Sequence, residues 1–304
     1  MTKSSDILVV GYPGAGKTTF IAALWHLLST EEYPSELVLE VLQPDRTHLN
    51  AIAKLWRECK EIERTKLSKE RTVTMNLKNR RNGATFKIAL PDSSGEGFRR
   101  TFESRRWSPG FAKLVTESGR LLFFIHPGFL KGAHLIDQDV EAAAEVAKQH
   151  MVAAGNEPRN EELKSQEVQD HTKGKSDSAS ENKPWSRDLA SPQAKLVDLM
   201  QLIRNATAAR LLRATIIISA WDVVGCENLT PKRWLRERIP LLWQYLESGC
   251  HICDYKVFGV SAQGADLIEA KSLLENIRPS QRIKVVDGEV SSHDITIPLQ
   301  WILE

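Results

Sequence analysis

The chain has few cysteines, no long apolar run and almost no net charge. Only four of its 304 residues are cysteine, which suggests a reducing compartment. Apolar runs such as 121–125 and 216–218 are far too short to span a bilayer. A net charge of +2 gives no reason to expect nucleic acid or an anionic membrane as the main partner. We therefore expect a cytoplasmic protein without a membrane span.

A zinc site and a signal peptide find little support either. Cys250 and Cys253 form a single C-x-x-C, and without a second pair a zinc ion lacks four clear ligands, even if His251 joins them. We interpret these cysteines as structural. The first apolar run opens directly into a glycine-rich loop, so no signal peptide is expected. With 41% hydrophobic and 26% charged residues, the composition is that of an ordinary globular protein with one large domain or two small ones.

The glycine-rich loop near the start carries the strongest signal. An apolar run of β type, 7–10, leads into it, and an apolar helical stretch, 19–28, leads out. Glycines let backbone N–H groups wrap a phosphate, and the helix N-terminus adds partial positive charge. We expect Lys17 to reach the β- and γ-phosphates of a nucleotide and Thr18 to hold Mg²⁺. The pattern G-x-x-x-x-G-K-[ST] predicts contacts from Gly11, Gly14, Ala15, Gly16, Lys17, Thr18 and Thr19.

Strand and helix signals alternate along the chain, which favours an α/β fold with a mostly parallel sheet. Asn82-Gly83 joins two β-type runs and predicts a hairpin. Thr230-Pro231 predicts a helix start. The expected strands are 6–10, 72–78, 84–90, 121–126, 215–219 and 256–260. The expected helices are 17–29, 45–64, 131–154, one around 196–203, one from 231 and 265–277.

Two of these segments are insertions in the predicted domain. Helical periodicity over 45–64 predicts an extra helix with Asp45 as its N-cap. The stretch 131–190 begins as an alanine-rich helix and continues as polar sequence. Between 155 and 184 its aliphatic residues beyond alanine are Leu163 and Val168, too few to offset the entropy of ordering. We interpret it as a flexible insertion inside one domain, because strand and helix signals resume after it.

Three further motifs follow expected strands. Asp92 and Gly95 form D-x-x-G, in which the aspartate can hold Mg²⁺ and the glycine N–H can contact the γ-phosphate. Asp222 ends a buried run where GTPases place Asn-Lys-x-Asp, and its carboxylate can accept hydrogen bonds from guanine N1–H and the exocyclic amine. Ser219 and Ala220 replace the Asn and Lys. Ser261-Ala262-Gln263 is similar to the Ser-Ala-Lys element, whose backbone touches guanine O6.

Together these motifs resemble those of a P-loop GTPase of the TRAFAC class. The exact residues in and around them resemble the bacterial double-GTPase family, type 2. The resemblance implies a three-layer, Ras-like G domain over 1–304, with one antiparallel strand and helices on both faces. It also implies GTP/GDP and Mg²⁺ as ligands, and protein partners from the same operon in a prokaryotic defence system. The resemblance rests on Arg71-Thr72, Asp92–Phe98, Arg106-Trp107, His126-Pro127, Ile218–Asp222, Val260–Gly264 and His293–Trp301.

The residues expected for GTP hydrolysis are less complete than those expected for nucleotide binding. The resemblance points to Thr72 as the switch threonine on Mg²⁺, with Thr65 and Thr74 as competitors. Glu96 stands where many small GTPases have a water-orienting glutamine, so we expect slow hydrolysis without a partner. Arg71 lies three residues before Thr74, the spacing of the internal arginine in heterotrimeric G-protein α subunits. Other candidate arginines are Arg99, Arg100, Arg105 and Arg106.

Two alternatives to a GTP-driven switch remain open. Ala220 in place of lysine leaves room for weak base selectivity, and therefore for a P-loop ATPase or kinase. The second alternative is a hydrolysis-impaired scaffold whose bound nucleotide is structural.

Overall fold

The computed structural model describes residues 6–62, 71–92, 104–130, 190–207, 213–224, 228–248 and 254–304. All of them belong to one unit formed by Met1–Lys131 and Ala190–Glu304. The insertion expected at 131–190 therefore lies outside the described residues, apart from its last position. No helix in the described ranges combines the length and the apolar character needed to cross a bilayer.

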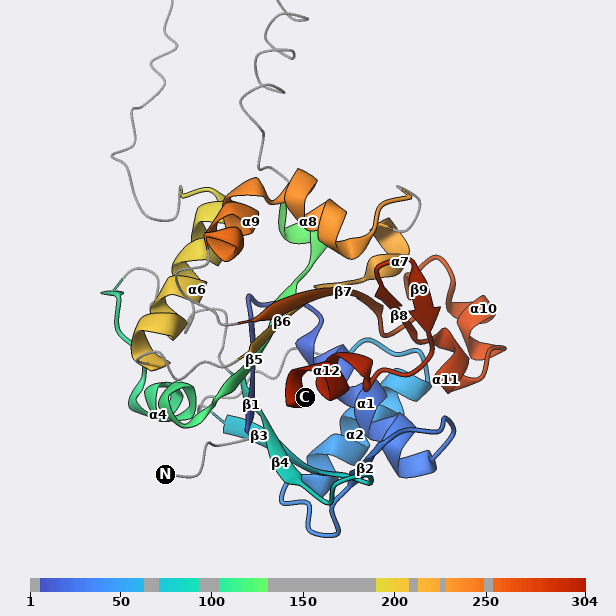
Figure 1. Ribbon diagram of the computed structural model, residues 1–304. Coiled ribbons are helices and arrows are strands. Elements are labelled where there is room, and N and C mark those ends of the chain that lie inside the picture. Colours follow the sequence, from blue (N-terminus) through green and yellow to red (C-terminus); the bar gives the residue numbers. More distant parts are fainter. Residues whose placement is uncertain are drawn as a thin grey trace, which may run out of the picture. The chain divides into compact units, whose positions relative to one another are not determined.

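A nine-stranded sheet in the order β2-β3-β4-β1-β5-β6-β7-β8-β9 forms the middle layer of this unit (Figure 1). The five central strands, β4 to β7, pair in parallel, as the alternating pattern predicts. The strands are β1 Ile7–Gly11, β2 Leu37–Leu39, β3 Arg71–Asn79, β4 Thr85–Asp92, β5 Arg120–Ile125, β6 Arg213–Ser219, β7 Tyr255–Ser261, β8 Lys284–Asp287 and β9 Val290–Ser292.

The prediction of one antiparallel strand is wrong. At one end of the sheet β3 runs against β4, and at the other end β8 runs against β7. The β3–β4 hairpin at Asn82-Gly83 is confirmed, with Lys78 opposite Thr85. The β8–β9 hairpin turns through Gly288 and Glu289, with Asp287 opposite Val290.

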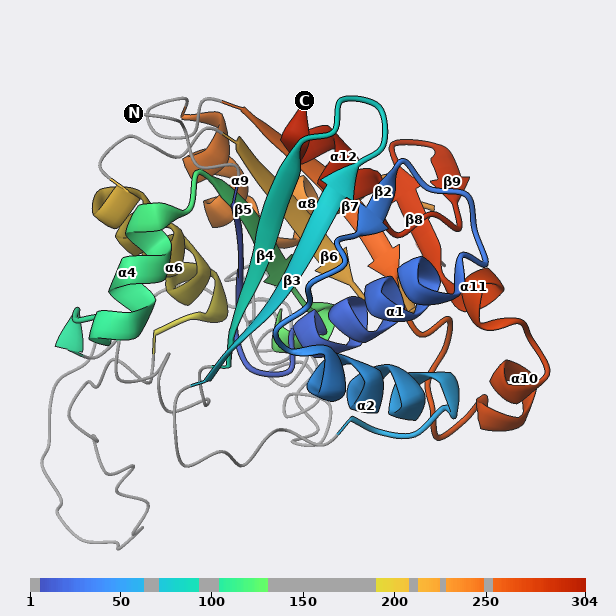
Figure 2. The same cartoon turned by 90° about the horizontal axis from the view of Figure 1, so that it is seen from below.

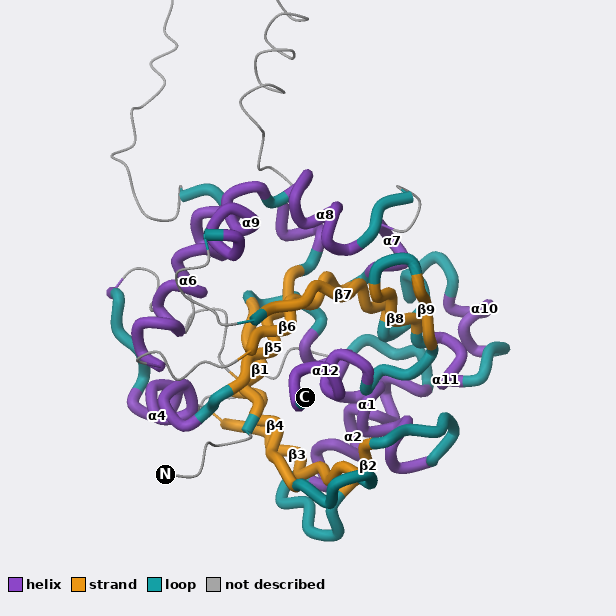
Figure 3. Tube along the Cα trace, in the orientation of Figure 1, coloured by secondary structure: helices purple, strands orange, loops and turns teal. Residues whose placement is uncertain are grey.

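Helices cover both faces of the sheet, as expected. Figures 1, 2 and 3 show α1, α2 and α12 on one face and α4, α6, α8 and α9 on the other. The helices are α1 Lys17–Thr30, α2 Arg46–Arg57, α4 Pro109–Glu117, α6 Pro192–Thr207, α7 Trp221–Val224, α8 Pro231–Arg238, α9 Pro240–Glu247, α10 Lys271–Glu275, α11 Pro279–Arg282 and α12 Ile297–Leu303, with a 3₁₀ turn, η1, at Pro127–Leu130.

Two hydrophobic cores lie against the two faces. Successive residues of β1 alternate between them: Ile7 and Val9 pack in the core under α1, whereas Leu8 and Val10 pack in the core under α6. Because both faces of the strand are buried, its sequence is apolar throughout. This packing fixes the β1 strand that leads into the glycine-rich loop.

The helix expected over 45–64 is shorter, ending at Arg57. Cys59 has a φ of 50°, and the Lys60 N–H donates to the Leu55 carbonyl, 2.9 Å away. This left-handed turn terminates the helix. Asp45 precedes the helix but its side chain makes no capping bond. Instead, its Oδ2 accepts hydrogen bonds from the N–H and hydroxyl of Thr74, at 2.8 and 2.9 Å.

The prediction of a helix over 265–277 is largely wrong, because within that range only Lys271–Glu275 is helical. The carboxylate of Asp266 accepts hydrogen bonds from the N–H groups of Ile268 and Glu269, at 2.7 and 3.2 Å. Such a local side-chain turn competes with helix formation. At Thr230-Pro231, by contrast, the predicted start is confirmed, with the Thr230 hydroxyl accepting from the Arg233 N–H.

Candidate functional site

The glycine-rich loop between β1 and α1 is held by close contacts that only glycine permits at two positions. A Cβ on Gly11 would lie 2.6 Å from the Phe124 carbonyl oxygen on β5. Gly16 has a φ of 80°, and a Cβ there would lie 3.0 Å from Cβ of Ser219 on β6. Gly16 is also the N-cap of α1 and brings no capping side chain. The first turn of α1 therefore has backbone N–H donors that suit an anion.

The lysine of the loop folds over it. Lys17 Nζ donates hydrogen bonds to the carbonyl oxygens of Gly11, at 2.6 Å, and Tyr12, at 3.0 Å. The Tyr12 hydroxyl donates in turn to the Lys195 carbonyl on α6, and its ring stacks on Phe129 with 4.9 Å between centroids. Burial raises the pKa of Tyr12, so it stays a protonated donor. These contacts hold the start of the loop, at Gly11 and Tyr12, in place.

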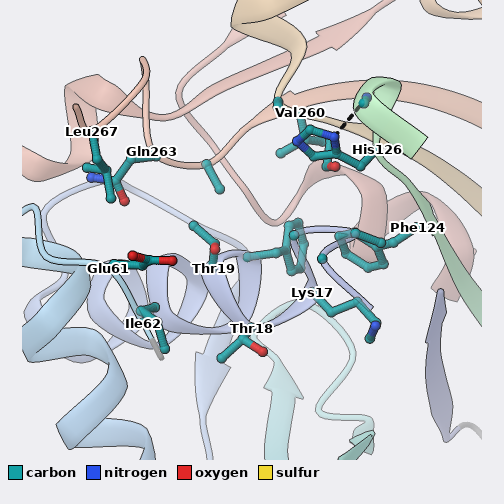
Figure 4. A pocket seen from close by; sticks show the side chains of 18 of the residues that line it. Lys17, Thr18, Thr19, Glu61, Ile62, Phe124, His126, Val260, Gln263 and Leu267 are labelled. Atoms are coloured by element: carbon teal, nitrogen blue, oxygen red, sulfur yellow. Dashed lines mark hydrogen bonds between the residues drawn. The ribbon is translucent and has the colours of Figure 1, made fainter. Parts of the chain in front are cut away.

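A pocket of ≈ 1030 Å³ opens above this loop, at the carboxyl ends of the parallel strands. Open α/β sheets bind their ligands at this edge. The volume suits a ligand of nucleotide size. Figure 4 shows Lys17 and Gln263 at opposite ends of the pocket. Its lining includes six of the seven predicted loop residues, Gly14, Ala15, Gly16, Lys17, Thr18 and Thr19, with Gly11 just beneath them on β1.

The end of the pocket away from Lys17 includes the loop that follows β7, where Figure 4 shows Gln263. The segment that follows β6 also lines the pocket. Asp222 is exposed in the first turn of α7, and its Oδ1 accepts a short hydrogen bond from the Ser261 hydroxyl. The Ser261 oxygen accepts in turn from the Gly264 N–H, at 3.1 Å. Asp222 and Ala262 both line the pocket. The structure thus brings the two predicted base-recognition motifs together and orients the carboxylate of one through the other.

Gln263 stands in the same loop, where the resemblance expects lysine. Its side chain lines the pocket, and Nε2 is buried without a hydrogen-bond partner among the residues that the structure describes. Ser219, which replaces the expected asparagine, donates instead to the Ile125 carbonyl, 3.2 Å away. Both replaced positions therefore lie at the pocket.

His126 follows β5 and also lines the pocket. Its Nδ1 accepts a hydrogen bond from the Gly128 N–H at 2.9 Å, drawn as the dashed line in Figure 4. A nitrogen that accepts cannot carry the proton, so the ring holds its proton on Nε2. This hydrogen bond fixes the orientation of the imidazole at the edge of the pocket.

The predicted switch residues are brought to the site only in part. Thr72 lies opposite Pro91 in the β3–β4 pair, and Pro91 lines the pocket whereas Thr72 does not. Thr74, a competitor, is held by Asp45. β3 begins at Arg71 and β4 ends at Asp92, and their backbones pair. The positions outside the described residues are Thr65, Gly95, Glu96, Arg99 and Arg100, and the side chains of Arg71 and Asp92 are not described either.

One of the candidate arginines has a different role. Arg105 forms a short ion pair with Asp198, a buried residue of α6. Removing one partner of an ion pair with a buried carboxylate is costly, so Arg105 ties the segment before α4 to α6. Arg106 is exposed.

The tail motif that contributed to the resemblance is structural in this fold. Asp294 Oδ1 accepts hydrogen bonds from the Thr296 N–H, at 2.9 Å, and its hydroxyl, at 2.6 Å. Asp294 Oδ2 accepts from Gln300, and the Thr296 hydroxyl lies 2.8 Å from that of Ser35, before β2. This network ties the start of α12 to the segment before β2, and none of these four residues lines the pocket.

Sequence reasoning missed the residues that α2 contributes to the site. His48 lies on the helix, and Glu61 and Ile62 follow its terminating turn; all three line the pocket. The sequence identified α2 only as an insertion. Its amphipathic pattern shows which side is buried but not what that side packs against, so no signal in the sequence marked these residues.

A family model described as Double-GTPase 1 matches residues 8–302 of the chain. No curated protein gave a significant match. The family match covers the glycine-rich loop, both base-recognition motifs and the tail. This match agrees with the resemblance to a double-GTPase. The matching family is Double-GTPase 1, however, whereas the residues of the motifs resemble type 2.

Proposed function

The chain belongs to the double-GTPase family, and from this premise we propose that it is a molecular switch that binds GTP and hydrolyses it slowly on its own. The membership suggests GTP binding and GTPase activity. The proposal adds which residues do this and in what setting.

One observation carries the choice of guanine: Asp222 and Ala262 line the end of the pocket away from Lys17, and Ser261 orients the Asp222 carboxylate. A carboxylate accepts two hydrogen bonds side by side, which matches the N1–H and exocyclic amine of guanine. Adenine has an acceptor at that edge and would leave the carboxylate facing a lone pair. A site that is built to hydrogen-bond one base discriminates against a base that lacks the matching donors.

At the other end, the first turn of α1 and the Lys17 ammonium suit the phosphates. The residues that would hold Mg²⁺ are Thr18, Thr72 and Asp92, all oxygen donors of the kind that this ion prefers. Thr18 lines the pocket beside Lys17, so its hydroxyl would be available to hold the ion next to bound phosphates. When bound, Mg²⁺ neutralises phosphate charge during transfer.

For hydrolysis we propose Lys17, Glu96 and Arg71 as the catalytic residues. Lys17 stabilises charge on the phosphates, and Glu96 orients the attacking water or accepts its proton. A carboxylate near the γ-phosphate also adds negative charge, which is the reason to expect slow turnover. Arg71, or an arginine from a partner, offsets that charge.

The biological setting is proposed from the resemblance alone. Proteins encoded beside this chain, as in prokaryotic defence systems, would read its GTP-bound state and could complete its catalytic set. The cytoplasm is the expected compartment, and bacteria the expected source.

Equilibrium binding of GTP, GDP and ATP to the full chain tests the proposal, with single-turnover hydrolysis as the second measurement. We expect GTP and GDP to bind at least tenfold more tightly than ATP. Equal binding of ATP would favour a P-loop ATPase or kinase, the alternative that Ala220 leaves open. Tight GTP binding with no single-turnover hydrolysis, even with the neighbouring gene products, would favour a scaffold.

Glu96→Gln separates binding from turnover. We expect the variant to change the single-turnover rate while leaving the Kd for GTP within about twofold, because the γ-phosphate contacts of Lys17 remain. Identical rates in both forms would remove Glu96 from the mechanism.

A further inference from the structure

The α2 helix contacts the base-recognition loop directly, through a tryptophan. Trp56 is fully buried, and its Nε1–H donates a hydrogen bond to the Ala262 carbonyl at 2.9 Å. These residues are 206 positions apart in the sequence. The bond holds the peptide between Ala262 and Gln263, in the loop where guanine O6 would be contacted.

A buried arginine braces the same contact. Arg282 is 6% exposed, and its Nη1 donates to the Arg57 carbonyl and contacts Cys59 Sγ, each at 3.0 Å. Its guanidinium carbon lies 5.9 Å from the centroid of the Trp56 ring, a cation–π distance. The end of α2 and the Trp56 indole are therefore held by one fixed cation.

The base-recognition loop packs against the backbone of the same arginine. A Cβ on Gly264 would lie 2.9 Å from the Arg282 carbonyl oxygen. Gly264 N–H also donates to the Ser261 hydroxyl, which donates to Asp222. A continuous series of contacts thus runs from Trp56 and Arg282 through the loop to the carboxylate that faces the pocket.

We propose that Trp56 is a positioning residue for guanine recognition. Through it, α2 helps to hold the base-recognition loop in place. The inference rests on the proposed GTP function and extends it to a residue that need not touch the nucleotide. Because the indole bond orients the Ala262–Gln263 peptide, its loss should loosen the contacts to the base. The phosphate contacts at the other end of the pocket should be unaffected.

The chain offers a matched control for this claim. Trp25 on α1 is also buried, and its Nε1–H donates at 2.8 Å to Oδ1 of Asn50, on the same α2 helix. Trp25→Phe therefore removes an indole hydrogen bond and a similar volume from the α1–α2 contact, without touching the loop at 261–264.

The experiment measures Kd for GTP, GDP and ATP on the full chain, wild type, Trp56→Phe and Trp25→Phe, each with its melting temperature. For Trp56→Phe we expect GTP and GDP to bind about fivefold more weakly, the loss of about one hydrogen bond. ATP should stay within twofold, so that selectivity falls about fivefold. Trp25→Phe should lower the melting temperature similarly but keep the wild-type selectivity.

Equal selectivity in Trp56→Phe and the wild type overturns the inference, and so does an equal loss of selectivity in Trp25→Phe. If Trp56→Phe does not fold, Arg282→Lys takes its place. This variant keeps the positive charge but loses the guanidinium hydrogen bonds to the Arg57 carbonyl and Cys59 Sγ at the end of α2. We expect the same selective loss of affinity for GTP and GDP. If the wild type itself shows no preference for GTP over ATP, the proposed function has failed and not only this inference.

Discussion

The two ends of the pocket are built in different ways. The end that we propose for the phosphates comes from one continuous stretch, Gly11–Thr19, in which a strand, a loop and a helix follow one another. The end that we propose for the base is assembled from α2, the β6–α7 junction and the loop after β7, and Trp56 contacts Ala262 across 206 positions. A local motif can specify the first end by itself, whereas the second exists only when the whole sheet is folded.

The largest expected effect comes from breaking the phosphate end. Lys17→Ala should weaken GTP, GDP and ATP binding by roughly 100-fold, because a charge-assisted contact to phosphate is lost and the loss does not depend on the base. Isothermal titration with the three nucleotides measures this. A loss confined to GTP would mean that the two ends are not independent.

Damage to the base end should be smaller and selective. Ser261→Ala removes the donor that orients Asp222 and the acceptor of the Gly264 N–H. We expect GTP affinity to fall about tenfold, from the loss of these two hydrogen bonds, and ATP affinity to stay within twofold. Ser280→Ala, a buried serine of α11, is the control. Parallel losses for both nucleotides in Ser261→Ala would contradict the division of the pocket.

The smallest effect concerns the stability of the base end at mildly acidic pH. His26 is buried beside Trp56, with 5.2 Å between ring centroids, and burial lowers its pKa although Glu32 partly opposes this. A histidine whose pKa is lower in the folded protein favours the unfolded state as pH falls below about 6.5.

Melting temperature measured between pH 7.5 and 5.5 tests this. It should fall by a few degrees in the wild type and less in His26→Phe, which cannot take up the proton. The same slope in both proteins would exclude His26 as the source.

The difference between local and assembled parts of the pocket also decides what the sequence could predict. β1, the loop and α1 were predictable because glycine spacing and apolar pattern are local, as were the hairpin at Asn82-Gly83 and the helix start at Thr230-Pro231. Asp222 and Ser261 were recognisable as motifs, but the hydrogen bond between them was not.

The failures have physical causes as well. Asp266 forms a side-chain turn that stops the helix expected over 265–277, and Asp45 binds Thr74 on a distant strand instead of capping its own helix. Trp56 reads as a core residue in the sequence, and its indole partner is set by tertiary packing alone.

The central claim is that Asp222 selects guanine, and Asp222→Asn tests it most directly. An asparagine keeps one acceptor but places an amide donor where the second carboxylate oxygen was. It therefore suits xanthine, which has a carbonyl where guanine has its exocyclic amine. We predict that Asp222→Asn binds XTP at least tenfold more tightly than GTP, whereas the wild type has the opposite preference. Unchanged preference for GTP in Asp222→Asn would contradict the assignment of this carboxylate to the base.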